Sequence, residues 1–283
     1  MGERISDPFL VVYGDSLLRL DYTELLGFHR STQSHCTIVY HRPVFSDFLY
    51  EYHDNALSYC GKRTNYGVLD VNSNERVVHC VEKPPLDEIK KRFENAVASA
   101  AVYLLRKSTL DHIPPDTASD FPSDLFPKLI SRSVPCYGFD IGKGYRIDIG
   151  TLPSYYKTQM SILHGEIPFD LQHYLSESGG IWFAGKPVPL HSSQFTPPLL
   201  LCSNCSIGDG TVIDRSIIGN DVAVGSSCKI RNSILLDHVV VGDGVEISTS
   251  VVGENCRIYA GSILPKNTVL GSYCTIGDPN SFQ

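Results

Sequence analysis

Four short motifs in the first half of the chain place chemically useful residues at strand ends and turns. They are Gly14-Asp15-Ser16, Tyr66-Gly67-Val68, Glu82-Lys83-Pro84 and the run Gly144-Tyr145-Arg146-Ile147-Asp148-Ile149-Gly150-Thr151. Carboxylate oxygens suit a hard cation, a lysine suits an anion, and a glycine lets the backbone approach a ligand. Each motif also has a purely structural interpretation, because aspartates begin turns and a lysine beside a proline is more often solvated.

The elements that must position these motifs alternate between strand and helix. The apolar run Phe9–Tyr13 ends at Gly14-Asp15, and Tyr22–Arg30 has helical spacing with Asp21 as a possible N-cap. Further strands are expected at 36–40, 66–71, 77–82 and 98–105, and a helix at 123–131. This pattern predicts an α/β layer with a mostly parallel sheet, in which ligands bind outside the carboxyl ends of the strands, where Asp15 falls.

The tail from Ile207 to Leu270 repeats in sixes, with an aliphatic residue in one slot and a small residue four places on. The aliphatic slot holds Ile207, Val224, Ile230, Val241, Ile247, Ile258 and Leu264, and the small slot holds Thr211, Cys228, Val245, Cys256, Ser262 and Thr268. A helix cannot keep a six-residue period on one face, whereas three short strands per coil can. The tail resembles the left-handed parallel β-helix of hexapeptide-repeat proteins.

Composition limits the class of protein. The chain has 283 residues, 42% of them apolar, and a formal net charge of −7, which argues against a nucleic-acid partner. No stretch approaches a membrane span, so no membrane partner is expected. Nine cysteines without an apolar signal core predict reduced thiols and a cytoplasmic location. Several cysteines occupy small inward slots of the coils, which favours packing over a zinc site.

The four motifs in this order, with hexapeptide coils behind them, resemble the sugar-nucleotide pyrophosphorylases, which join a sugar 1-phosphate to an NTP and release pyrophosphate. The resemblance covers most of residues 9–163 and continues into the coils. It is greatest to mannose-1-phosphate guanylyltransferases, with heptose-1-phosphate guanylyltransferases and glucose-1-phosphate adenylyl- or thymidylyltransferases close behind. It implies an incomplete Rossmann-like nucleotidyltransferase sheet in residues 1–175, a linker at 176–198 and a left-handed β-helix at 199–283.

The resemblance also implies residue roles. Asp15 and Asp148 match the two aspartates that bind Mg²⁺, and Lys83 matches the catalytic lysine that meets the sugar phosphate. Glu82 matches the carboxylate that accepts hydrogen bonds from sugar hydroxyls, and Gly67 lets the backbone approach the sugar. Thr151 is expected to cap a helix that begins near Pro153. The implied ligands are an NTP and a sugar 1-phosphate, and the β-helix is expected to form a homo-oligomer.

Two departures from the family pattern bear on activity. The Gly-rich segment GxGxRLxPxTxxxPKP, which holds the NTP phosphates, does not occur in the chain. Its absence would also leave the strand at Phe9–Tyr13 with an unpaired edge. The second departure is Ala98-Ser99-Ala100-Ala101-Val102-Tyr103, where the family reads Asn-Ala-Gly-Ile-Tyr. Ser99 therefore replaces the amide that binds the sugar, and Ala101 adds a methyl group.

Three explanations fit the missing segment: a truncated gene model, which the position of Met1 just before a strand favours, a decayed or regulatory paralogue, or a fragment. We expect residues 1–283 alone to have little or no turnover. The alternative function is a non-catalytic, pyrophosphorylase-like regulatory or assembly subunit. A third is an acyltransferase using His238, although a histidine at a turn of the coils is expected to be solvated.

Overall fold

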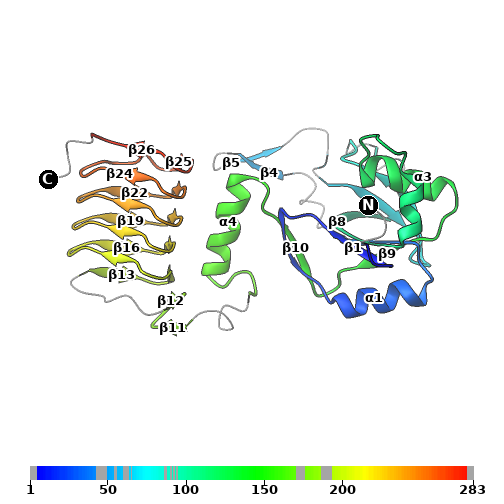
Figure 1. Ribbon diagram of the computed structural model, residues 1–283, viewed down its shortest axis with the longest axis horizontal. Coiled ribbons are helices and arrows are strands. Elements are labelled where there is room, and N and C mark those ends of the chain that lie inside the picture. The colour runs from blue at the N-terminus through cyan, green and yellow to red at the C-terminus, as the bar shows by residue number, and fades with distance from the viewer. Residues whose placement is uncertain are drawn as a thin grey trace. The chain divides into compact units, whose positions relative to one another are not determined.

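The computed structural model describes residues 5–42, 50–53, 56–59, 64, 66–85, 88, 89, 91, 93, 95–169, 176–185 and 193–278. It divides into two compact units, Met1–Ser154 and Tyr155–Gln283 (Figure 1). The first unit holds a mixed α/β sheet and the second a parallel β-helix, so the predicted fold class is confirmed. Among the described residues, no helix has the length and apolar character needed to cross a membrane.

The first unit is built from these elements, with α4 running on into the second: β1 Phe9–Val12, β2 Ser16–Arg19, α1 Tyr22–Ser31, β3 Cys36–His41, β4 Tyr50–His53, β5 Ala56–Tyr59, β6 Val68–Val71, β7 Val77–Val81, β8 Ala96–Leu105, a 3₁₀ turn Lys107–His112, a helical segment Phe121–Leu125, α3 Phe126–Ser131, β9 Cys136–Asp140, β10 Tyr145–Asp148 and α4 Leu152–Leu163. Asp21 caps α1 as predicted, because its side chain accepts hydrogen bonds from the Thr23 and Glu24 amides.

The main sheet has the order β7-β6-β8-β3-β9, and β1 pairs with the end of β8. Only β3 and β9 are parallel among its described pairs, so the prediction of a mostly parallel sheet is wrong. Short connections explain the difference. The turn between β6 and β7 is closed by Asn72, whose side chain accepts hydrogen bonds from the Asn74 and Arg76 amides, and so short a turn joins antiparallel neighbours.

Strand β1 carries the apolar edge that the sequence predicts. It pairs with β8 through Phe9↔Leu105 to Val12↔Val102, and no other described strand pairs with it. Leu10 and Val12 are 42% and 44% exposed. Immediately after β1, the chain forms β2, which pairs with β10 in a separate antiparallel ribbon. This ribbon brings the first and last of the four sequence motifs together.

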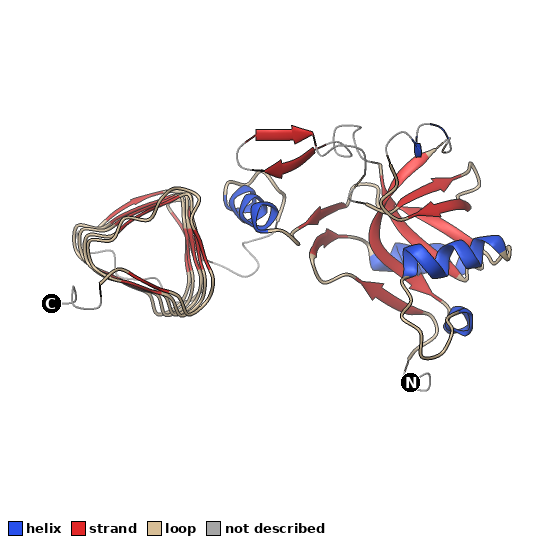
Figure 2. Ribbon diagram, turned by 90° about the horizontal axis from the view of Figure 1, so that it is seen from above, coloured by secondary structure: helices blue, strands red, loops and turns tan. Residues whose placement is uncertain are grey.

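The second unit stacks short strands into three parallel ladders, seen end-on as a triangle in Figure 2. One ladder is β12-β14-β17-β20-β23-β25 with β11 at its end, the second is β13-β16-β19-β22, and the third is β15-β18-β21-β24-β26. The strands are β11 Ser176–Ser178, β12 Ile181–Phe183, β13 Gln194–Thr196, β14 Leu199–Leu201, β15 Ser206–Ile207, β16 Val212–Asp214, β17 Ile217–Ile218, β18 Ala223–Val224, β19 Lys229–Arg231, β20 Ile234–Leu235, β21 Val240–Val241, β22 Glu246–Ser248, β23 Val251–Val252, β24 Arg257–Ile258, β25 Val269–Leu270 and β26 Thr275–Ile276.

The predicted aliphatic slots lie inside the coils. Ile230 pairs with Ile213 on one side and Ile247 on the other, and the three side chains are between 0% and 1% exposed. Small polar residues form a second inner ladder, in which the Ser216 hydroxyl accepts from the Ser233 amide at a separation of 17 residues. Bonds of this kind satisfy buried polar groups of one coil through the next coil.

The stack begins earlier than residue 199, within the predicted linker 176–198. β12 pairs in parallel with β14, and Ile181 and Phe183 are buried in the same core as the later coils. Residues 186–192 of that linker lie outside the described residues. Helix α4 also packs on the coils, because Met160 and Leu163 form a cluster with Ile234 and Val251 on the outer face of the ladder. The division between units therefore falls before the predicted boundary at 175.

The coil cysteines are packing residues. Cys228 and Cys256 are fully buried, and their thiols donate to the Gly242 and Gly271 carbonyls. Cys202 and Cys205 form a CxxC pair, and burial raises the pKa of Cys202 to about 11. Such a thiol stays protonated and is a poor metal ligand. No three His, Cys, Asp or Glu side chains converge as a metal site in the part of the chain that the structure describes.

Candidate active site

The β2–β10 ribbon brings Asp15 and Asp148 together. Asp148 lies opposite Ser16 in the ribbon, and the Ile149 amide donates to the Asp15 carbonyl at 2.9 Å. A methyl group built on Gly150 would lie 3.1 Å from Asp15 Oδ2 and 3.2 Å from Asp148 Oδ1. The two carboxylates therefore border the same space, which stays open because residue 150 is a glycine.

Arg146 supports one of these carboxylates, a role that the sequence analysis did not assign. Its Nη2 donates to Asp148 Oδ2 at 2.9 Å, and its Nε donates to Ser16 Oγ at 3.2 Å. The Arg146 side chain is only 7% exposed. Arg146 and Asp148 stand two residues apart on one strand, so their side chains share a face. That spacing was the signal from which this pair could have been predicted.

A second group of predicted residues surrounds Gly67. A methyl group built on Gly67 would lie 2.9 Å from Glu82 Oε2 and 3.6 Å from the Cβ of Ser99, so a side chain here would displace both neighbours. The Ser99 amide donates to the Gly67 carbonyl at 2.8 Å. The structure therefore brings Gly67, Glu82 and Ser99 together, and the missing side chain of Gly67 leaves space beside the carboxylate.

Glu82 and Lys83 have different environments although they are adjacent. Partial burial is the main cause of a raised pKa at Glu82. The positive charge of Lys83 lowers this pKa, and the negative charge of Asp120 raises it. Lys83 Nζ lies 3.9 Å from Glu82 Oε1, and the Lys83 side chain is 59% exposed. At this distance and exposure the pair contributes little to stability, so the ammonium can exchange its partner at low cost.

Three further polar residues line the Glu82 side of the site and were not predicted. The Tyr13 hydroxyl donates to Asp120 Oδ1 at 3.5 Å, and the rings of Tyr13 and Tyr103 meet edge to face at 5.9 Å. Burial raises the pKa of both tyrosines, so both hydroxyls remain protonated donors. Of these three residues, Tyr13 could have been suspected from the sequence, because it directly follows strand β1 and precedes Gly14-Asp15.

The two groups are joined through Tyr66. The Arg146 guanidinium lies over the Tyr66 ring at 5.2 Å from its centroid, and Tyr66 directly precedes Gly67. Arg146 thus contacts Asp148 on one side and the residue next to Gly67 on the other. Arg146 and Tyr66 therefore link strand β10, which carries Asp148, to the segment that carries Gly67.

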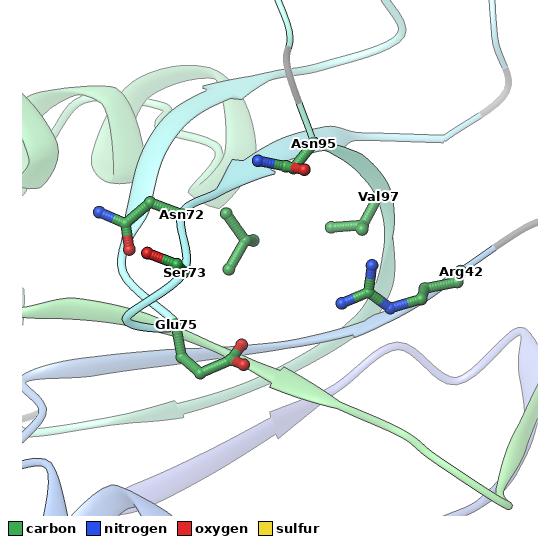
Figure 3. Close-up of a pocket in the computed structure, with 7 residues that line it drawn as sticks. Arg42, Asn72, Ser73, Glu75, Asn95 and Val97 are labelled. Carbon is green, nitrogen blue, oxygen red and sulfur yellow. The ribbon is translucent and has the colours of Figure 1, made fainter.

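This region is distinct from a hollow of about 170 Å³ at the far end of β6, shown in Figure 3. The hollow is lined by Arg42, Val71, Asn72, Ser73, Glu75, Asn95 and Val97. Gly67 precedes β6 and Asn72 follows it, so the two places lie at opposite ends of that strand. Arg42 pairs there with Asp140 at 3.0 Å. None of the predicted site residues lines the hollow.

Ala101 departs from ordinary backbone geometry. Its φ is +56°, in the left-handed region that favours glycine. The same stretch of β8 shifts register against β3 between Ile38 and Tyr40. Ser99 stabilises the irregularity, because its hydroxyl accepts from the Ala101 amide at 3.2 Å. The sequence predicted that the methyl group of Ala101 takes up space where the family has a glycine. The structure also shows that the backbone of Ala101 is strained.

Each of the two units is similar to a known family. Residues 53–165 match the nucleotidyl transferase family model, and residues 181–281 match the model of the LbH (left-handed β-helix) domain of the EIF2B epsilon subunit. The chain is therefore similar to the nucleotidyl transferase family over residues 53–165 and to this β-helix domain over residues 181–281.

Curated relatives place the resemblance among glucose-1-phosphate enzymes. The chain is 25% identical over 271 residues to a UTP–glucose-1-phosphate uridylyltransferase of Synechocystis, covering 95% of this chain and 60% of that protein. It is 25% identical over 282 residues to a glucose-1-phosphate adenylyltransferase of Desulfitobacterium hafniense, with the same coverage. Glucose-1-phosphate adenylyltransferase 2 of Vibrio cholerae is 27% identical over 256 residues, covering 78% and 59%. The chain spans about 60% of the length of these relatives.

Proposed function

We propose that the chain carries the metal and sugar-phosphate half of a nucleotidyltransferase site, in which a sugar 1-phosphate attacks the α-phosphorus of an NTP and pyrophosphate leaves. The observation that carries the proposal is the convergence of Asp15 and Asp148 on the space left by Gly150. Two carboxylates fit Mg²⁺, which takes its remaining ligands from substrate phosphates and water. Bound Mg²⁺ would neutralise the charge that builds on the phosphates.

The residues around Gly67 suit a sugar. Glu82 Oε2 borders the open space beside Gly67 and can accept hydrogen bonds from sugar hydroxyls, while the glycine lets the ring approach the backbone. Ser99 sits beside both, in place of the expected amide, and Lys83 is exposed next to Glu82, where it can reach a phosphate. The roles proposed for Gly67, Glu82, Lys83 and Ser99 all concern this one ligand.

The substrate is proposed as a hexose 1-phosphate. Mannose 1-phosphate with GTP is the pair that the sequence motifs favour, whereas the names of the curated relatives favour glucose 1-phosphate with UTP or ATP. Titration calorimetry of the 283-residue chain with each sugar 1-phosphate, with and without Mg²⁺, separates these possibilities. We expect Mg²⁺-dependent binding of one of them, and loss of the Mg²⁺ dependence in Asp15→Asn and Asp148→Asn.

Turnover is measured as pyrophosphate release with GTP, ATP, UTP and dTTP. Because the chain contains no GxGxRL segment, we expect little or no release, and any release should depend on both aspartates. Lys83→Ala should chiefly raise the concentration of sugar phosphate needed. Measurable release that is equal in the wild type and Asp15→Asn would contradict the proposed function.

The second candidate is an assembly subunit without turnover, and the match of residues 181–281 to a domain of an EIF2B subunit favours it. The outer coils also expose large apolar side chains, with Ile263 72%, Val269 48% and Tyr273 77% exposed. Self-association through these coils is part of both candidates. Light scattering should give an oligomer, and Ile263→Asp with Tyr273→Asp should shift it toward the monomer.

A further inference from the structure

Arg146 has one nitrogen whose hydrogen-bonding capacity is unused. Nη2 and Nε are occupied by Asp148 and Ser16, but Nη1 is buried and has no acceptor among the described residues. A buried, charged donor without an acceptor is costly, so such groups in native proteins have a partner, a water or a ligand. The side chain is 7% exposed and held on three sides, so it is fixed in place rather than free to turn toward solvent.

The position of Arg146 indicates which ligand would supply the acceptor. One end of the site holds the Asp15 and Asp148 carboxylates, and the other end holds Gly67 and Glu82. Arg146 contacts both ends, through Asp148 and through the ring of Tyr66. A ligand with its sugar beside Glu82 and a metal at the aspartates must carry its phosphate between them. Arginine binds phosphate through parallel N–H donors.

We propose that Arg146 is a phosphate-binding residue of this site: Nη1 donates to a phosphate oxygen of the sugar 1-phosphate, while Nη2 and Nε hold Asp148 and Ser16. The inference rests on the proposed function for the identity of the ligand. Asp148 then has two separate tasks. Its Oδ2 neutralises Arg146, and its Oδ1, fixed by the Gly150 amide at 2.9 Å, borders the space shared with Asp15.

The test compares Arg146→Met, Arg146→Lys and the control Arg19→Met by titration calorimetry with glucose 1-phosphate, mannose 1-phosphate and inorganic phosphate. Arg19 is an exposed arginine on the same ribbon, so it controls for the loss of one positive charge. We expect Arg146→Met to weaken phosphate binding roughly 10- to 100-fold, the usual effect of losing a charged hydrogen bond. The phosphate affinity of Arg146→Lys should lie between those of the wild type and Arg146→Met. The phosphate affinity of Arg19→Met should stay within about twofold of the wild type.

Mn²⁺ affinity, measured by electron paramagnetic resonance without phosphate, separates phosphate binding from support of the site. Removing a cation next to Asp148 should leave Mn²⁺ affinity equal or higher. Loss of both Mn²⁺ and phosphate affinity in Arg146→Met and Arg146→Lys would show that Arg146 only maintains the fold, and would overturn the proposal. Unchanged phosphate affinity, or a wild type that binds none of the three phosphate probes, would overturn it as well.

The outcomes for the two proposals are distinct. Phosphate binding that needs Arg146 but depends neither on Mg²⁺ nor on Asp15 and Asp148 would leave this inference standing and reject the proposed function. Pyrophosphate release that depends on Asp15, together with normal phosphate binding in Arg146→Met, would support the proposed function and reject the role of Arg146. Circular dichroism and thermal melting of each variant establish that the compared proteins are folded.

Discussion

Asp15 directly precedes strand β2, Asp148 ends the paired strand β10, and their carboxylates border the same space beside Gly150. Neither aspartate is near the other in sequence. Their convergence depends on the pairing of β2 with β10 and on the absence of a Cβ at residue 150.

Gly150→Ala should weaken metal binding without unfolding the protein. The new methyl group would lie 3.1 and 3.2 Å from the two carboxylate oxygens, so both side chains must shift by a few tenths of an ångström. We expect roughly a tenfold loss of Mn²⁺ affinity, the usual scale for disturbing the surroundings of metal ligands. Gly14→Ala is the matched control, because a methyl group there meets nothing within 4 Å. Equal affinities in the two variants would contradict the placement of the metal.

Ala101→Gly should stabilise the first unit. The left-handed backbone costs an alanine about 1–2 kcal/mol, while glycine loses about 0.5–1 kcal/mol more entropy on folding. The expected net gain is about 0.5–1 kcal/mol in the free energy of unfolding, measured by urea denaturation. Ala100→Gly, at a fully buried neighbour that lacks this backbone conformation, should instead destabilise. A loss of stability in Ala101→Gly would argue against the strain at this residue.

The first unit should lose stability as the pH falls from 6.5 toward 4, because of His29. Burial, with a smaller contribution from Arg106, lowers the pKa of His29 to about 4. Between pH 4 and 6.5 the imidazole of His29 is protonated in the unfolded chain but neutral in the folded one, so a falling pH favours unfolding. The stability that the neutral His29 contributes is therefore fully present only above pH 6.5. The loss between pH 6.5 and 5 should be roughly 2 kcal/mol.

Urea denaturation of the wild type and His29→Asn across this pH range measures the effect. His29 is 2% exposed and its Nδ1 lies 2.8 Å from the Thr37 hydroxyl, so the variant will be less stable at pH 7, but its slope with pH should be flatter. His238→Asn removes an exposed histidine and should leave the slope unchanged. Identical slopes for all three proteins would contradict the lowered pKa of His29.

Ile230→Asp should unfold the coils. The side chain is 0% exposed and stacks between Ile213 and Ile247, so a carboxylate there would be buried without a partner. Arg231→Asp, one residue on and pointing outward, is the control and should remain folded. Limited proteolysis distinguishes them: rapid digestion of residues 193–278 is expected only for Ile230→Asp. A protease-resistant Ile230→Asp protein would contradict the inward orientation.

Local patterns in the sequence were enough to predict much of this protein. The hexapeptide period specifies the β-helix because each coil repeats the same inward slot, and the contacts it makes are with the next copy of the pattern. Asp21 and Thr151 cap their helices through amides two to three residues away. The four motifs also supplied five of the six site residues that we propose, Ser99 being the other, although the sequence could not state the distances between them.

Tertiary structure alone decided how these pieces meet. Strand direction depends on which strands pair, and the alternation of elements did not reveal that β8 runs antiparallel to β3 and β6. The stack includes Ile181, where β12 pairs with β14, although the regular hexapeptide pattern is first seen at Ile207. Arg146 gained its role from contacts with Ser16 and Tyr66, which are distant in sequence. The physical reason is the same in each case: local propensity specifies an element, whereas a site depends on side chains whose distances are set only by packing between elements.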